Sequence, residues 1–170
     1  MRLNKIFSLI AILCLAIAAC AQGGNDRGKA EVAIKGKTIS IDYGRPELKG
    51  RDLLSLAPVG TVWRLGKNQA TQIETTAELE VAGTKVAPGK YSLWAKKVSD
   101  SEWHLCFHPK TGIWGLPVQK EGYVAELPLK QSAGGSSVEL FTIALADNKG
   151  KANVSIQWGT MVLSGDIGVK

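Results

Sequence analysis

The apolar side chains recur with a period of two along almost the whole chain after residue 30, and this feature most constrains the fold. Ile39, Ile41 and Tyr43 alternate with polar residues, and the segment 91–95 repeats the pattern. Successive side chains point to opposite faces of a β-strand, whereas an amphipathic helix needs a period of 3.6 residues. No segment after residue 30 keeps the helical period for more than about two turns. The sequence therefore predicts a β protein.

Short segments rich in glycine, serine, asparagine or aspartate separate the strand candidates. They are "KGK" at 35–37, "SDSE" at 99–102, "SAGGSS" at 132–137 and "DNKG" at 147–150. Many short strands at such spacing are typical of antiparallel sandwiches and jelly rolls. We expect residues 30–170 to form a single all-β domain, an antiparallel β-sandwich or jelly roll, with one short helical turn at "DLLSLA", residues 52–57.

Residues 1–19 have the organisation of a signal peptide of the lipoprotein type. Arg2 and Lys5 precede an apolar stretch, residues 6–19, that is shorter than the roughly 20 residues needed to span a membrane. The segment "IAAC", which ends at Cys20, resembles the bacterial lipobox, in which the cysteine is linked to diacylglycerol and becomes the first residue after cleavage. We expect residues 20–29 to consist of a lipidated Cys20 and a flexible tether.

The predicted anchor gives the protein a membrane partner and a location in the cell envelope. Ala21 stands where an acidic residue would retain a lipoprotein in the inner membrane, so we expect an outer-membrane lipoprotein that faces the periplasm. The alternative is ordinary signal-peptidase cleavage within Ala19 to Ala21, which gives a soluble secreted or periplasmic protein. Cys106 is the one cysteine left for the domain, so no intramolecular disulfide is expected.

Positive charge is concentrated in the first third of the mature chain. Between Arg27 and Ala70 there are nine Lys or Arg residues and four Asp or Glu residues, whereas residues 71–170 hold ten of each sign. This excess indicates either a solvated basic face, attracted to an anionic membrane, or a site for an anionic group. No nucleic-acid partner is expected.

The segment "YGRPELKGR", residues 43–51, concentrates cations and backbone constraints directly after a predicted strand. Pro46 fixes its own φ and keeps Arg45 extended, while glycines on either side permit tight bends. A second segment, "TVWRLGKNQAT" at 61–71, adds another guanidinium group and side-chain amides. Arginine binds carboxylate and phosphate through paired hydrogen bonds, although loop arginines also pair with neighbouring acids. The sequence predicts a ligand-binding cluster made of Arg45, Lys49, Arg51, Trp63, Arg64 and Asn68.

These segments resemble a bacterial family known as domain of unknown function 2911. The resemblance rests on Arg-Pro at 45–46, Lys-Gly-Arg at 49–51, Trp-Arg at 63–64 and Asn-x-Ala-Thr at 68–71, followed by "VAGTKVAPGKYSLW", "EWHLCF" and "GIWG" in the same order. It spans roughly residues 31–160 and implies an exported bacterial β-domain. The resemblance implies no reaction.

Two rival functions draw on other side chains. Glu47 and Asp52 could act as proton carriers in an envelope hydrolase, although carboxylates beside three cations are more simply ion-paired. His104, Cys106 and His108 point to one side of a predicted strand and are donors that suit zinc or copper. In the simpler interpretation Cys106 is a small apolar residue of a buried strand, since no other histidines exist to complete a site.

The tryptophans divide by position. Trp63, Trp94, Trp103 and Trp158 lie in predicted strands, where core packing is their usual role, whereas Trp114 lies in a loop and could stack on a sugar ring. Taken together, the sequence predicts a non-enzymatic binding module for an anionic or polar ligand, such as a glycan or a cell-wall fragment.

Overall fold

The structure is a computed structural model that describes residues 26–53 and 55–170. The predicted signal peptide, the lipidated Cys20 and the first part of the tether lie outside the described residues. The described chain contains no helix with the length and hydrophobicity needed to cross a membrane.

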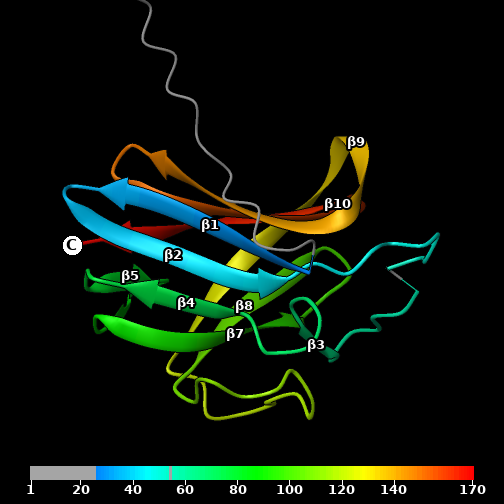
Figure 1. Ribbon diagram of the computed structural model, residues 1–170, viewed down its shortest axis with the longest axis horizontal. Helices are drawn as coiled ribbons and strands as arrows, with labels where there is room; N and C mark the ends of the chain where they lie inside the picture. The colour runs from blue at the N-terminus through cyan, green and yellow to red at the C-terminus, as the bar shows by residue number, and fades with distance from the viewer. Residues whose placement is uncertain (1–25, 54) are drawn as a thin grey trace, which may run out of the picture.

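Ten strands make up the described domain, which confirms the all-β prediction (Figure 1). They are β1 (Arg27–Ile34), β2 (Lys37–Gly44), β3 (Val62–Arg64), β4 (Gln72–Thr75), β5 (Leu79–Val81), β6 (Thr84–Val86), β7 (Gly89–Lys97), β8 (Glu102–His108), β9 (Ala125–Asn148) and β10 (Lys151–Val169). All belong to one antiparallel sheet in the order β1-β2-β4-β7-β8-β9-β10-β5-β6, with β3 paired to β7 beside this path. The sheet is not closed. Because β1 begins at Arg27, residues 27–29 lie in the sheet although the sequence assigned them to the tether.

The C-terminal hairpin is longer than the sequence predicted. The turn expected at "SAGGSS" lies inside β9, which runs for 24 residues, and β10 runs for 19. The pairing of β10 with β9 shifts twice around Gly159, so that residues 134–137 and 139–141 of β9 leave the regular ladder. Glycine and serine do accumulate here, but they form a bulge within the hairpin rather than its end.

The helical turn expected at residues 52–57 is not seen in the described part of this segment, residues 52–53 and 55–57. Instead, the chain turns at this point: the Ser55 hydroxyl donates to the Asp52 carbonyl at 3.0 Å, and the Ser55 N–H donates to Oδ1 of Asp52 at 3.4 Å. Six residues are too few to offset the cost of starting a helix unless the segment packs as one.

Most of the buried apolar side chains form one core cluster, which draws on strands from across the sheet. Leu93 and Ala95 of β7 and Trp103, Leu105 and Phe107 of β8 are buried in the main cluster, as their alternation predicted. The strands of the N-terminal hairpin and of the C-terminal hairpin supply most of the remaining apolar side chains, and β1 lies near β9.

A second, smaller cluster lies on the opposite face of β7 and β8. Trp94 and Cys106 are fully buried there, and side chains of the loop after β8, Ile113 and Tyr123 among them, cover the cluster. Burial, together with the charge of Glu126, raises the pKa of the Cys106 thiol from 9.0 to about 12.

The segment that follows β2 is fastened to β9 and crosses another loop at close range. The amide of Phe141 donates to the Pro46 carbonyl at 2.9 Å, and the amide of Leu48 donates to the Glu139 carbonyl at 2.8 Å. At the start of this segment, a Cβ on Gly44 would lie 2.8 Å from the backbone nitrogen of Lys67 and closer still to its carbonyl oxygen. Only glycine permits this crossing.

We expect the Gly44→Ala substitution to lower the free energy of unfolding by about 1–3 kcal/mol, because the added methyl group meets backbone atoms that cannot move aside. Urea denaturation would measure the loss. Gly135→Ala is the matched control, since nothing lies within 4 Å of a Cβ at that position. Equal stability of the two variants would contradict the close approach.

The buried thiol gives a second prediction. Because the pKa of Cys106 is raised in the folded state, the unfolded chain loses the thiol proton at a lower pH than the folded chain does. The stability that the protonated thiol contributes is therefore complete below pH 9 and is lost as the pH rises toward 12. Above pH 9 the wild type should therefore lose stability more steeply than Cys106→Ala, by up to about 1.4 kcal/mol per pH unit. Parallel profiles of unfolding free energy between pH 8 and pH 11 would show that the thiol is not shielded from water.

Candidate functional site

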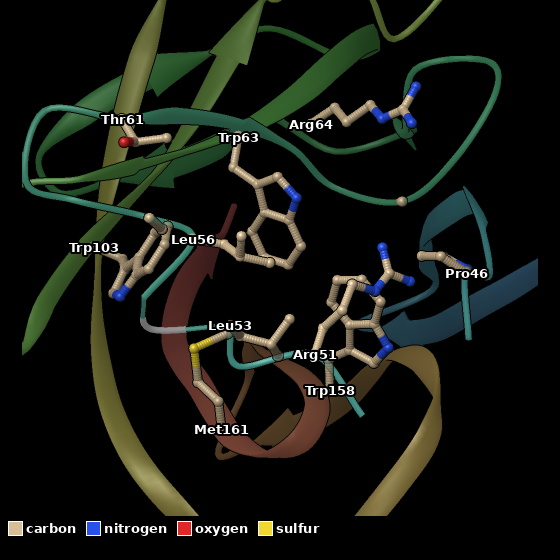
Figure 2. A pocket seen from close by; sticks show the side chains of 12 residues that line it. Pro46, Arg51, Leu53, Leu56, Thr61, Trp63, Arg64, Trp103, Trp158 and Met161 are labelled. Carbon is tan, nitrogen blue, oxygen red and sulfur yellow. The ribbon is translucent and has the colours of Figure 1, made fainter. Parts of the chain in front are cut away.

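A pocket of about 150 Å³ lies between residues 51–53 and 56–57 on one side and strands β3, β8 and β10 on the other (Figure 2). Its wall is mostly apolar and includes three of the five tryptophans. The lining residues are Pro46, Arg51, Leu53, Leu56, Ala57, Thr61, Trp63, Arg64, Gly66, Trp103, Trp158 and Met161.

The three indole rings hold one another in place. Trp63 stacks on Trp158 with ring centroids 5.7 Å apart and an interplanar angle of 7°, and it meets Trp103 edge to face at 6.1 Å. Phe141 joins the cluster with edge-to-face contacts, 5.7 Å from Trp63 and 5.9 Å from Trp158. Offset stacking and edge contacts of this kind are the favourable arrangements of aromatic rings. The pocket wall is therefore formed by packing, without any ligand.

The irregular pairing of β10 with β9 places Trp158 in this cluster. The register shifts on either side of Gly159, which has a φ of 59° and faces the side chain of Leu48. A bulge redirects the side chains beside it and bends the strand. Trp158 is thereby brought beneath the segment 46–51, more than a hundred residues earlier in the chain.

The indole N–H groups of the three tryptophans differ in their partners. Trp103 Nε1 donates to Oε1 of Gln131 at 2.9 Å, and Trp158 Nε1 donates to the Glu139 carbonyl at 3.2 Å. The Trp63 Nε1–H has no acceptor within residues 26–53 and 55–170, and it is not a fully buried atom. Trp63 thus offers the pocket a hydrogen-bond donor.

Backbone carbonyls and an indole ring hold Arg51 in position. Its Nε donates to the Leu48 carbonyl at 2.9 Å, and one terminal nitrogen donates to the Glu47 carbonyl. The guanidinium group also lies over the Trp158 ring, 4.9 Å from its centroid. No carboxylate of the described chain forms an ion pair with Arg51. Its charge is fixed in place and still available to an anion.

Arg64 borders the same pocket, but its guanidinium group extends away from it. Trp63 and Arg64 are successive residues of β3, so their side chains leave on opposite faces. Figure 2 shows Trp63 pointing toward Leu56 and Trp158 while Arg64 points away from them. The Arg64 side chain instead packs on Gly115, where a Cβ would come within 3.1 Å of its Cδ.

The other three residues of the predicted cluster do not line the pocket. Arg45 Nε donates to the Phe141 carbonyl at 3.4 Å. Lys49 pairs with Glu47 at 3.2 Å, and its amide donates to a Glu139 carboxylate oxygen at 2.8 Å. Asn68 is exposed. The structure thus places Arg51, Trp63 and Arg64 at one pocket and leaves Arg45, Lys49 and Asn68 around it.

A second pocket of about 380 Å³ adjoins the first. The two pockets share Arg51, Leu53, Trp158 and Met161 as a common wall. The remaining lining residues of the second pocket are mainly polar: Leu48, Asp52, Gln131, Ser132, Ala133, Ser137, Gly159 and Thr160.

The two carboxylates considered as proton carriers lie apart from the first pocket. Glu47 is exposed and paired with Lys49, and it lines neither pocket. Asp52 lines the second pocket and accepts hydrogen bonds within its own turn. The two residues do not flank a common cavity, so the geometry offers no acid and base facing one substrate.

The three candidate metal ligands on β8 have other contacts. His104 Nδ1 lies 2.8 Å from Glu126, and Nδ1 of His108 accepts the amide of Lys110 at 3.1 Å. Burial lowers the pKa of His108, and the charge of Lys110 adds to this effect. Cys106 is buried in the second cluster. In the described ranges, no three His, Cys, Asp or Glu side chains are grouped so that they could hold a metal ion.

Sequence reasoning assigned Trp103 and Trp158 to the core, and both are indeed buried, yet both also line the pocket. The sequence contained one signal for Trp158, the glycine that follows it inside a strand pattern, which marks a bulge. Trp114, expected in an exposed loop, is 56% exposed and belongs to neither pocket.

The similarity of the chain to one protein family covers nearly the whole described domain. No curated protein and no solved structure matches the chain. The family described as "Protein of unknown function (DUF2911)" matches residues 26–167, which include the strands and loops that form both pockets. This agrees with the resemblance found in the Arg-Pro, Lys-Gly-Arg and Trp-Arg segments. The chain therefore belongs to the DUF2911 family.

Proposed function

We propose that this protein is a non-enzymatic binding module of the bacterial cell envelope that holds an anionic ring of a glycan or a cell-wall fragment. In this proposal the ring enters the tryptophan pocket, and its carboxylate or phosphate binds Arg51. The observation that carries the proposal is a guanidinium group fixed over an indole ring at the edge of a cavity, with no acidic partner among the described residues.

The size and lining of the pocket support a single ring. A cavity of about 150 Å³ holds one six-membered ring, as apolar protein cavities of that volume do. The faces of sugar rings carry C–H groups that pack on indole, while their oxygens need donors. Trp63 Nε1 supplies such a donor beside the apolar side chains of the wall.

The distribution of charge supports an anionic group. Several cations of the first third are neutralised by acids: Arg27 by Asp42, Lys29 by Glu31, Lys49 by Glu47 and Lys67 by Asp26. Arg51 is held by carbonyl groups, which orient a guanidinium group without cancelling its charge. A ligand carboxylate beside Arg51 would form the ion pair that the described residues do not supply.

The proposal includes a place in the cell. The signal-peptide pattern of residues 1–19 and the lipobox-like "IAAC" support an outer-membrane lipoprotein anchored through Cys20 and facing the periplasm. It also includes a sandwich-like arrangement of the sheet, supported by β1 lying near β9 and by one core cluster that draws on both hairpins.

The role of Arg51 can be tested with glucuronic acid and glucose, which share a ring and differ in the carboxylate. Because three tryptophans line the pocket, ligand entry should change the intrinsic fluorescence. We expect glucuronic acid to bind more tightly than glucose, and Arg51→Gln to weaken glucuronic acid binding by roughly tenfold to a hundredfold, as loss of a charge-assisted hydrogen bond does. Arg51→Lys should give an intermediate loss.

Lys49→Gln is the matched control, since it removes one positive charge from the same segment at an exposed position outside both pockets. It should leave binding unchanged, and thermal melting should show that all variants fold. Equal losses in the two Gln variants would show a diffuse charge effect and contradict a specific role for Arg51.

The anchor has its own test. Cells fed an alkyne-tagged fatty acid should incorporate the label into the wild-type protein and not into Cys20→Ala, because the thiol of Cys20 is the attachment point. The label is read by gel fluorescence after click coupling. Cys106→Ala serves as the control and should remain labelled, since that thiol lies in the folded core. Labelling of Cys20→Ala would overturn the lipoprotein assignment.

A further inference from the structure

We propose that the second pocket is a subsite for a neutral sugar residue, so that the ligand is an oligosaccharide in which an acidic ring is followed by an uncharged one. This inference rests on the proposed function of the first pocket. It concerns a cavity of about 380 Å³ that the acidic ring itself does not need.

The two cavities are joined rather than separate. Arg51 and Trp158 belong to the walls of both, as do Leu53 and Met161. An acidic ring held in the first pocket with its carboxylate on Arg51 therefore has the second pocket directly beside it. A residue attached to that ring by a glycosidic bond would continue along this shared wall.

The lining chemistry differs between the two pockets. Ser132, Ser137 and Thr160 offer hydroxyl groups to the second pocket, each able to donate and to accept a hydrogen bond. Gln131 uses its Oε1 to accept from Trp103, which leaves its Nε2 as a donor. Side chains that can both donate and accept hydrogen bonds suit the hydroxyl groups of a sugar.

Charge separates the two subsites as well. Asp52 lines the second pocket and not the first. Arg51 borders both pockets, and in the proposed complex the carboxylate of the first ring already occupies it, so a second acidic group would meet the like charge of Asp52. The second pocket therefore selects a neutral ring, and an oligomer made of acidic rings alone would gain nothing from it.

Isothermal titration calorimetry on the mature protein in detergent can test this with four probes. The first pair is glucuronic acid and the disaccharide of glucuronic acid with N-acetylglucosamine. The second pair is galacturonic acid and digalacturonic acid. We expect the mixed disaccharide to bind on the order of tenfold tighter than its acidic monosaccharide. Digalacturonic acid should show no such gain over galacturonic acid.

Neighbouring serines supply a matched pair of variants. Ser137→Phe fills the second pocket and should abolish the advantage of the mixed disaccharide, whereas Ser136→Phe, an exposed residue outside both pockets, should preserve it. An advantage that survives in Ser137→Phe would place the second ring elsewhere and overturn the inference. So would an equal gain for digalacturonic acid.

The failure of this inference is distinguishable from failure of the proposed function. If glucuronic acid binds in an Arg51-dependent manner and the disaccharide binds no tighter, the second subsite is wrong and the binding module stands. If neither probe binds, the proposed function fails and the subsite fails with it.

Discussion

The candidate site depends on one contact, the pairing of residues 46–48 with β9. Two backbone hydrogen bonds, from Phe141 to Pro46 and from Leu48 to Glu139, fasten a segment from the first third of the chain to the C-terminal hairpin. The same two residues, Leu48 and Glu139, then contact the pocket side chains, since Leu48 accepts from Arg51 and Glu139 accepts from Trp158. A loop that would otherwise project into solvent becomes one wall of a cavity. Its geometry is set by a sheet, which is stiffer than a loop.

This attachment explains why the pocket exists before any ligand arrives. The aromatic rings are packed against each other and against Phe141, and Arg51 is held by backbone carbonyls rather than by an acid. Binding therefore needs little rearrangement, and ordering costs that would weaken a small ligand are avoided. The polar groups left over, the Arg51 charge and the Trp63 indole N–H, define what the site recognises.

Local patterns predicted much of the fold and three of the twelve residues that line the first pocket, Arg51, Trp63 and Arg64. Period-two alternation identified the strands and the buried faces of β7 and β8, and turn residues identified both terminal hairpins. The pattern could not predict that β9 continues through residues 132–137, because serine and glycine are typical of turns and of bulges alike. It identified Arg51 and Trp63 but not Trp103, Trp158 or Met161. These come from strands that pair only in the folded chain, where long-range register, not composition, decides which residues meet.

The place where the domain begins has a mechanical consequence. Asp26 receives a hydrogen bond from the amide of Arg45 at 2.9 Å, and its carboxylate pairs with Lys67. The chain thus enters the domain through two contacts that hold the start of the segment 45–51 and the loop after β3. A pulling force applied at Asp26 would act first on the segment 45–51 and on the loop after β3, the two elements that border the cavity. The first described residue of the domain thus contacts both of the elements that border the cavity.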